Sequence, residues 1–519
     1  MDRRTFLSTA LIAGSATALA GLAGCAPATS GSAVGDEAGS GNESGLRTAQ
    51  TGPQEKTVDI AIVGAGGSGL CAALTAQAGG ASVCLIEAMP MTGGATIGST
   101  ATNICGSRMQ RDAGIEDGPE QILASYVDDI ENPYVLETAE MYANNNGETY
   151  DWLIDEIGAQ MQDEVQYFAP YPVARIVYPI GGGQGTVDAL TAKVAETDID
   201  LMLDTVATEI IREDGTVTGL VVETSDGAQC RINAKAVILA AGGFAGNENM
   251  IPRDVYETGV YYGTASSDGK SVPMALVAGC QLLDLGCVPL EGGGLEVSPG
   301  IGIQLFSPVM AAYGGASGIM VGPDGNRVVN ELSGAPALVP VYKALPDATA
   351  YLFMDNATFK VFYGAGTREV GGAFTAETFE KWVAADGKEL PLIVKADTIE
   401  EAAAKAGIDA AGLQATIDAW NADAEGGMDS QFKRPIKAPI GDGPYCVVKQ
   451  NLRYAHTFGG LVANGQLQVL DWANEPIPGL YAAGQMLRSF QGNTSKPSSS
   501  TSFAYTSGRQ AAVSALKTL

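Results

Sequence analysis

The feature that most constrains this chain is the glycine-rich run GAGGSG, which begins at Gly64 and separates two apolar segments. Residues 58–63 are typical of a buried strand, residues 70–78 of a helix, and residues 82–86 of a second strand. This order predicts a βαβ unit with a tight turn after its first strand. Because a helix N-terminus attracts anions, the turn is a candidate site for the phosphates of a dinucleotide.

The three glycines of this unit and its final acid each have a distinct physical role. Gly64 permits the turn, Gly66 lets the backbone approach a pyrophosphate, and Gly69 packs the helix closely on the strand. Glu87 ends the second strand eighteen residues after Gly69, where a carboxylate can bond a ribose hydroxyl. The alternative is a glycine-rich turn without a ligand. Because the strand, turn, helix, second strand and acidic residue occur in the order and at the spacing of the motif, the sequence favours a dinucleotide site.

Length and charge restrict the remaining classes of function. At 519 residues the chain exceeds one hydrophobic core, so two or three structural units are expected. Thirty basic and fifty-nine acidic residues give a net charge of -29, which repels nucleic-acid phosphates and anionic lipid headgroups. We therefore expect no nucleic-acid partner.

The first residues are typical of an export signal. Arg3 and Arg4 precede a small-residue apolar run that is too short for a stable membrane span, so residues 1–24 are predicted to be a signal peptide of the twin-arginine type. The segment LAGC, ending at Cys25, resembles a bacterial lipobox, in which that cysteine carries the lipid. The alternative is a plain signal with a chance cysteine. The sequence favours an extracytoplasmic protein that is anchored to the cell membrane through Cys25.

Residues 25–55 are rich in small, polar and acidic residues and predict a flexible tether. The chain contains no CxxC or CxxCH motif, so we expect no c-type haem. Scattered cysteines leave cluster ligation open, but buried apolar packing is the favoured interpretation. The seven cysteines after the tether are Cys71, Cys84, Cys105, Cys230, Cys280, Cys287 and Cys446.

Other glycine-rich segments are further candidates for contact with a dinucleotide. The run MTGGATIGS, from Met91, suits close backbone approach, and a buried strand over 234–245 contains Gly242 and Gly243. Other expected elements are a helical region over 118–158, a glycine-rich turn into a helix over 181–196, a hairpin over 201–222 about Asp214 and Gly215, a helix over 272–278, two strands over 319–331, two helices over 398–423, a strand over 479–484 and a final helix over 501–516.

The order of motifs resembles the flavoprotein family of soluble fumarate reductases, urocanate reductases and 3-ketosteroid dehydrogenases over nearly all of residues 57–516. The motifs are GAGGSG with Glu87, GGAT, AAGGFAGN, SDG, DGNRVVNE, HTFGG and PGLYAAGQ. The resemblance implies an α/β fold, with a Rossmann-like domain that binds FAD non-covalently and is split in sequence. An α+β capping domain is inserted in it. The expected ranges are 56–292 and 456–519 for the FAD-binding domain and 293–455 for the cap.

The resemblance also assigns candidate cofactor contacts residue by residue. Gln485 departs from the glutamate that is usual at its position in the family. The full set, with the glycines of the motifs, is Gly64, Ala65, Gly66, Ser68, Gly69, Glu87, Gly94, Thr96, Thr100, Val206, Gly242, Asp268, Gly484, Gln485, Ser500 and Thr501.

The substrate positions depart further from the family pattern. Fumarate reductases hold a dicarboxylate with arginines and use one arginine as the proton donor. A gapless match places Ala335 at the proton-donor position, where ketosteroid dehydrogenases would have tyrosine, and Ser495 at a carboxylate-binding arginine, with Lys496 beside it. His456, the sole histidine, is retained. Its alternative role is to orient the Gly459-Gly460 loop without touching a substrate.

Reduction of a C=C bond needs an acid that faces the flavin across the substrate. Tyr313 lies beside the position of a proton-path arginine in the family and is the preferred candidate, together with His456 and Lys496. Tyr342 is a reserve, and a buried structural role is the alternative for both tyrosines.

The sequence thus predicts an FAD-dependent reductase of a conjugated C=C bond, respiratory, with electrons from a separate cytochrome or membrane donor. The missing arginines favour an aromatic or polycyclic enone-like or enoate substrate over a small dicarboxylate. One alternative is a ketosteroid-type dehydrogenase that works in the oxidative direction. Another is a flavin electron carrier without a substrate of its own.

Overall fold

The computed structural model describes residues 54–168, 171–305, 316–333, 335–367, 373–493 and 495–519. Residues 55–519 form one compact unit by their internal contacts. In the described ranges, no helix is long and apolar enough to cross a membrane.

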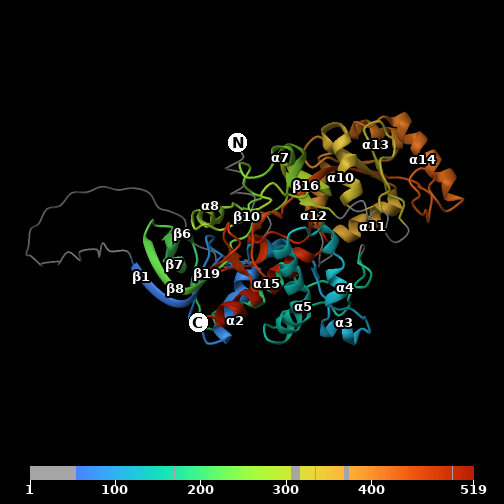
Figure 1. Cartoon of the computed structure of the whole chain (residues 1–519). Coiled ribbons are helices and arrows are strands. Elements are labelled where there is room, and N and C mark those ends of the chain that lie inside the picture. Colours follow the sequence, from blue (N-terminus) through green and yellow to red (C-terminus); the bar gives the residue numbers. More distant parts are fainter. Residues whose placement is uncertain (1–53, 169–170, 306–315, 334, 368–372, 494) are drawn as a thin grey trace, which may run out of the picture. The chain divides into compact units, whose positions relative to one another are not determined.

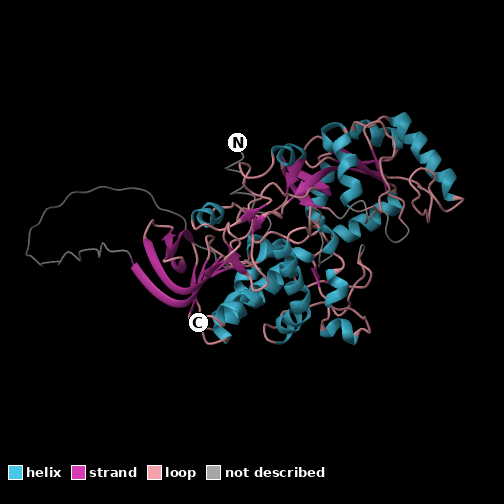
Figure 2. Ribbon diagram, viewed as in Figure 1, coloured by secondary structure: helices cyan, strands magenta, loops and turns pink. Residues whose placement is uncertain are grey.

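An eight-stranded sheet forms the first half of the fold (Figures 1 and 2). Six strands follow the order β18-β19-β8-β1-β2-β5, and β7 joins β8 and pairs with β6. The strands are β1 (Gln54–Val63), β2 (Val83–Ile86), β5 (Asp200–Met202), β6 (Thr205–Glu213), β7 (Thr216–Thr224), β8 (Gln229–Leu239), β18 (Gln468–Leu470) and β19 (Pro476–Ala482).

The centre of this sheet is parallel and apolar. β1 pairs in parallel with β2, β2 with β5, and β8 with β19. All four residues of β2 are buried, as expected for a parallel strand covered on both faces. The hairpin β6–β7 turns at Asp214 and Gly215, both at positive φ, which is the geometry that two-residue hairpin loops require.

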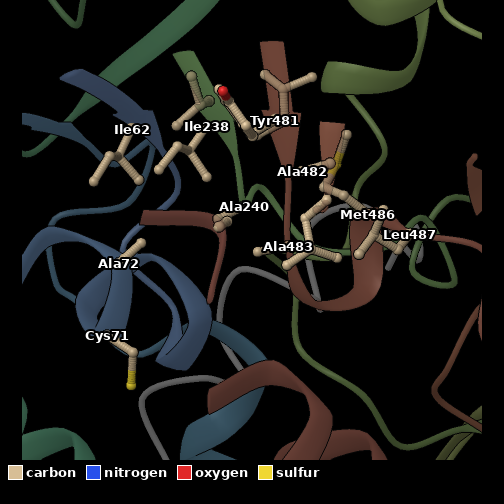
Figure 3. Packing of buried hydrophobic residues seen from close by; sticks show 14 of the residues in the cluster. Ile62, Cys71, Ala72, Ile238, Ala240, Tyr481, Ala482, Ala483, Met486 and Leu487 are labelled. Carbon is tan, nitrogen blue, oxygen red and sulfur yellow. The ribbon is translucent and has the colours of Figure 1, made fainter. Parts of the chain in front are cut away.

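Two helices far apart in sequence pack directly on each other beside this sheet: α2 (Gly67–Ala78) and α15 (Ser499–Leu516). A Cβ atom at Gly508 would lie 2.1 Å from the carbonyl oxygen of Ser68, so only glycine allows this approach. Figure 3 shows part of the core around α2, with Ile62, Ile238 and Tyr481 on the strands and Ala72 on the helix, whereas Cys71 points to the side of the helix away from these strands. The final helix α15 therefore packs against the helix of the first βαβ unit.

A seven-stranded sheet forms the second half, with the order β11-β12-β9-β16-β14-β13 and β15 paired to β16. Its strands are β9 (Gly259–Tyr261), β11 (Glu291–Ser298), β12 (Ile301–Gln304), β13 (Ile319–Val321), β14 (Thr349–Met354), β15 (Ile393–Ala396) and β16 (Tyr445–Tyr454). Its helices are α10 (Ala335–Ala344), α11 (Asn356–Gly366), α12 (Ala376–Ala384), α13 (Ile399–Ala406) and α14 (Ala410–Ala424). β9 pairs with strands of this sheet although it lies within residues 56–292, the range expected for the FAD-binding domain. The domain boundaries given above remain predictions.

The remaining described elements lie outside the two large sheets. They are β3 (Thr102–Asn103), α3 (Arg108–Asp112), α4 (Pro119–Leu123), α5 (Pro133–Asp155), β4 (Ile176–Val177), α6 (Gly182–Ala195), α7 (Arg253–Thr258), α8 (Ser271–Val277), β10 (Leu282–Leu283) and β17 (Gly460–Leu461), with 3-10 turns η1 (Gly94–Gly98), η2 (Val127–Asp129), η4 (Pro346–Ala348) and η5 (Gly484–Met486).

The structure corrects two predicted elements. The second strand expected within 319–331 is reduced to one bridge between Val321 and Arg327, because Arg327 turns inward to pair with buried Glu331. The helical region over 118–158 is divided into α4, η2 and α5. Pro133 begins α5, since proline suits the first turn of a helix but not its interior. The strand expected over 234–245 forms as β8, which spans Gln229–Leu239, so that Gly242 and Gly243 lie in the loop after it. The other elements named above form at or near their predicted ranges.

Candidate functional site

A single cavity collects the glycine-rich loops that follow the strands of the first sheet. Gly64 follows β1, Glu87 follows β2, Gly242 follows β8 and Gly484 follows β19, and all four line the cavity. Its volume is about 1340 Å³, counted with the part open to solvent. Loops at the carboxyl ends of parallel strands are where open α/β sheets bind nucleotides.

Two glycines of the first turn are required by close backbone contacts. Gly64 has φ +101, and a Cβ there would lie 2.4 Å from the carbonyl oxygen of Ala240. A Cβ at Gly69 would lie 1.7 Å from the carbonyl oxygen of Gly64. The turn, the loop after β8 and the start of α2 are therefore in direct contact, as the motif predicts.

The N-terminus of α2 is open toward an anion. Gly66 is its N-cap and offers no side-chain cap, and the first turn holds no acidic residue. The amide of Gly67 donates to Thr96 Oγ1 at 3.1 Å, which ties the GGAT segment to the helix start. A Cβ at Gly66 would meet only the carbonyl oxygen of Gly93, at 3.8 Å. The backbone thus leaves open space of the kind that a dinucleotide's phosphates need.

Glu87 is held by the same turn. Its carboxylate accepts from the Ala65 amide at 2.7 Å and from the Met89 amide at 3.0 Å. Burial raises the pKa of the Glu87 carboxyl, and these amide donors oppose the rise. Each carboxylate oxygen has a second lone pair, so the group can still accept a ribose hydroxyl.

Most of the predicted cofactor residues lie on this cavity. Three do not line it: Ala65, whose amide holds Glu87, Gly69, which packs behind Gly64, and Thr100. The predicted residues that line it are Gly64, Gly66, Ser68, Glu87, Gly94, Thr96, Val206, Gly242, Asp268, Gly484, Gln485, Ser500 and Thr501. FAD fits this donor set, with Glu87 for the adenosine ribose and the α2 turn for the pyrophosphate.

The predicted catalytic residues are placed differently. His456 lines the cavity, between the strand β16 and the loop Thr457–Phe458 that also lines it. Lys496 is described but does not line the cavity, and its amide donates to the Gln491 side chain at 2.8 Å. Tyr313 lies outside the described residues. The reserve Tyr342 is fully buried in the core of the second sheet, which favours its structural role.

The structure brings to His456 three residues that the sequence analysis missed: Tyr262, Glu291 and Arg453. The hydroxyl of Tyr262 lies 3.4 Å from His456 Nε2, and the two rings meet edge to face. Arg453 stacks over the Tyr262 ring at 4.5 Å and pairs with Glu291. The four side chains are named the His456 cluster below. Arg453 and His456 are close in the sequence, and this spacing was the one available signal. Tyr262 and Glu291 come close to them only because separate strands pair.

The cysteines give no sign of a metal centre. Six of the seven are buried and Cys287 is half-buried, and none of them forms a disulfide. Burial raises the pKa of the Cys446 thiol to about 12, so it stays protonated. No group of metal-ligating side chains occurs in the part of the chain that the structure describes. These observations favour the apolar role of the buried cysteines.

Gly66→Ala is expected to fold normally but to bind FAD roughly tenfold or more weakly, a loss of about 1.4 kcal/mol. Its φ and ψ, -73 and -177, suit alanine, yet the methyl group would fill the space open to the phosphates. FAD titration of the apoprotein by flavin fluorescence measures this. Gly364→Ala is the control, because that Cβ meets nothing within 4 Å, and equal affinity in both variants would contradict the phosphate assignment.

Comparisons with known proteins agree with this geometry. The family described as FAD binding domain matches residues 59–501. The structure is similar to the open conformation of a flavocytochrome c3 fumarate reductase, with a TM-score of 0.74 and 26% identity, covering 90% of this chain and 79% of that one.

Three curated relatives are reductases. NADH:fumarate oxidoreductase of Klebsiella pneumoniae is 26% identical over 84% of this chain, which spans only 45% of that protein. Urocanate reductase of Eggerthella lenta is 29% identical, covering 88% of this chain and 74% of the relative. Vinyl phenol reductase of Lactiplantibacillus plantarum is 27% identical, covering 87% and 94%.

These matches confirm the predicted resemblance and the FAD cofactor. The family covers the first βαβ unit, the second sheet and the loop that carries His456. The chain therefore belongs to the family of FAD binding domain flavoproteins.

Proposed function

We propose that this protein is an FAD-dependent reductase of a conjugated C=C bond. The observation that carries the proposal is that His456, with Tyr262 beside it, lines the same cavity as the dinucleotide-binding loops. A hydrogen-bonding group and a flavin can thus act on one substrate. That the related proteins include reductases named for fumarate, urocanate and vinyl phenol supports this reaction class.

Bound FAD supplies the hydride that such a reduction requires. The chain's own residues must then hold the substrate and deliver a proton to the neighbouring carbon. Burial lowers the pKa of the His456 imidazole, and Arg453 lowers it further against the opposing effect of Glu291. His456 is therefore neutral near pH 7, and it acts by hydrogen bonding to the substrate or by passing a proton from Tyr262.

The substrate in this proposal is an aromatic or polycyclic enone-like or enoate compound, not a small dicarboxylate. Ala335 and Ser495 stand where the resemblance expects arginines, and a planar carboxylate is held best by a bidentate guanidinium. The vinyl phenol reductase relative is named for an aromatic substrate without a carboxylate, which is consistent with this assignment.

The test is a panel assay with purified, FAD-loaded protein and reduced methyl viologen, using enones, cinnamates, stilbenes and fumarate. We expect viologen oxidation with an aromatic acceptor and little with fumarate. Efficient fumarate reduction would refute the substrate class. Turnover only with an oxidising dye and a saturated ketone would identify the dehydrogenase, and a reduced flavin that no acceptor reoxidises would identify the electron carrier.

We further propose a separate electron donor and a membrane anchor. The absence of CxxCH from the sequence supports an external cytochrome or membrane donor. Arg3, Arg4 and the lipobox support export by the twin-arginine route and lipidation of Cys25.

Cys25→Ser is expected to move the protein from the membrane fraction to the soluble extracytoplasmic fraction, because a lipid anchor is lost. Fractionation with an immunoblot measures this, and Cys287→Ser is the control that keeps the lipobox. A membrane-bound Cys25→Ser protein would refute the anchor.

A further inference from the structure

The His456 cluster lies where three strands of the second sheet meet. Tyr262 directly follows β9, and Arg453 lies in β16, which runs parallel to β9 with Tyr454 opposite Tyr261. Glu291 begins the antiparallel strand β11 and is registered opposite Arg453. His456 follows β16 by two residues and reaches the cofactor cavity. Strand pairing therefore fixes these groups beside the cavity.

The charges within the cluster cancel. Arg453 Nη2 lies 2.5 Å from Glu291 Oε2, and these side chains are 8% and 15% exposed. Arg453 is also held by its Nε donating to the Gly292 carbonyl at 3.1 Å and by the face of the Tyr262 ring. Burial alone would raise the pKa of Glu291, but Arg453 and His456 hold it below its ordinary value, and the Ser495 hydroxyl contributes. Glu291 is thus ionised and balances the charge of the Arg453 guanidinium through Nη2, while Arg453 Nη1 has no hydrogen-bond partner among the described residues.

This arrangement has a consequence for any anion that enters beside His456. An incoming carboxylate would lose part of its hydration beside an ion pair of zero net charge, at low solvent exposure, so no net positive charge would compensate for its burial. A neutral carbonyl or hydroxyl group carries no charge that must be compensated. It can form a hydrogen bond with His456 or Tyr262 in place of the bond between them.

We propose that Glu291 determines substrate charge: by pairing with Arg453 it makes the His456 edge of the cavity select a neutral carbonyl group over a carboxylate. This inference deepens the proposed function and rests on it. Specificity of this kind arises from a penalty on the wrong ligand as well as from contacts with the right one.

The test uses two acceptors of nearly equal shape, trans-4-phenyl-3-buten-2-one and trans-cinnamate, which differ by a methyl group in place of a carboxylate oxygen. The measured quantity is the ratio of kcat/KM for the ketone to that for the acid, with reduced methyl viologen and FAD-loaded protein. Glu291→Gln, which frees Arg453, is expected to lower this ratio about tenfold or more, whereas Glu291→Asp should keep it within roughly threefold.

Arg453→Gln provides the opposite test, because it leaves Glu291 unpaired and should raise the ratio. The double variant with glutamine at both positions is neutral again and should return the ratio toward the wild-type value. Shifts of opposite sign would not follow from simple damage to the fold. A ratio unchanged in Glu291→Gln and in Arg453→Gln, with FAD bound, would overturn the proposal, as would shifts of the same sign.

A binding measurement separates this inference from the proposed function. The saturated compounds 4-phenyl-2-butanone and 3-phenylpropanoate are titrated against the oxidised holoenzyme, and the flavin absorbance change gives two dissociation constants. If neither alkene is reduced but the ratio of these constants shifts in Glu291→Gln, the reductase assignment fails and charge selection stands. If the ketone is reduced and neither ratio shifts, the reductase stands and charge selection fails.

Discussion

Replacing His456 by alanine is expected to lower kcat for the aromatic acceptor by about 10²–10⁴-fold, the usual contribution of a positioned acid or base. The imidazole lines the cofactor cavity and is the partner of the Tyr262 hydroxyl, so its loss removes both a substrate contact and the route of a proton from Tyr262. Steady-state turnover with reduced viologen measures the change.

The half-reactions distinguish this role from a structural one. Reduction of bound flavin by viologen without substrate should proceed normally in His456→Ala, and FAD content should be unchanged, whereas reoxidation by the acceptor should be slow. His456→Gln is the matched variant, because it keeps a neutral hydrogen-bonding group and should lose less activity. Normal reoxidation in His456→Ala would assign the histidine to orientation of the Gly459-Gly460 loop.

Removing the Asp117 carboxylate is expected to destabilise the protein by about 3–5 kcal/mol, because it leaves a buried guanidinium without its counter-charge. The side chains of Asp117 and Arg175 are completely buried, and their two contacts, Nε to Oδ2 and Nη2 to Oδ1, are both 2.7 Å. Arg175 Nη1 also donates to the Ser125 hydroxyl at 3.1 Å. Urea unfolding of Asp117→Ala with FAD in excess measures the loss.

This pair also bears on the cofactor site. Tyr171, over whose ring Arg175 lies at 5.4 Å, and Tyr126 both hydrogen-bond to Ser499 Oγ at the start of α15. Ser500 and Thr501 follow on that helix and line the cavity. We therefore expect Asp117→Ala to weaken FAD binding as well as to lower the free energy of unfolding.

An exposed pair provides the control for this prediction. Lys381 and Glu377 lie 2.8 Å apart on one helix with side chains 73% and 79% exposed, so Lys381→Ala should leave the free energy of unfolding nearly unchanged. A double variant, Asp117→Leu with Arg175→Met, should be more stable than Asp117→Ala, since no charge is left unpaired. Equal losses in Asp117→Ala and Lys381→Ala would contradict this account.

The sequence alone determined the elements whose causes are local. Gly64, Gly66 and Gly69 predict the turn because each position has one backbone requirement, and the structure shows two of these as contacts that no Cβ would permit. Asp214 and Gly215 predict their hairpin for the same reason. The order of the motifs predicted the family and the FAD cofactor, because the identity and spacing of motif residues can be read directly from the sequence.

Tertiary structure decided the elements whose causes are distant. The second of the two strands expected over 319–331 is reduced to a single bridge, because Arg327 and Glu331 belong to a buried network with Arg434, which is over a hundred residues away. The His456 cluster likewise forms only because β9 and β11 pair with β16. No sequence pattern near Tyr262 or Glu291 predicts this pairing. Charge pairing and strand register act through space, so local pattern predicts the cofactor site better than the substrate edge.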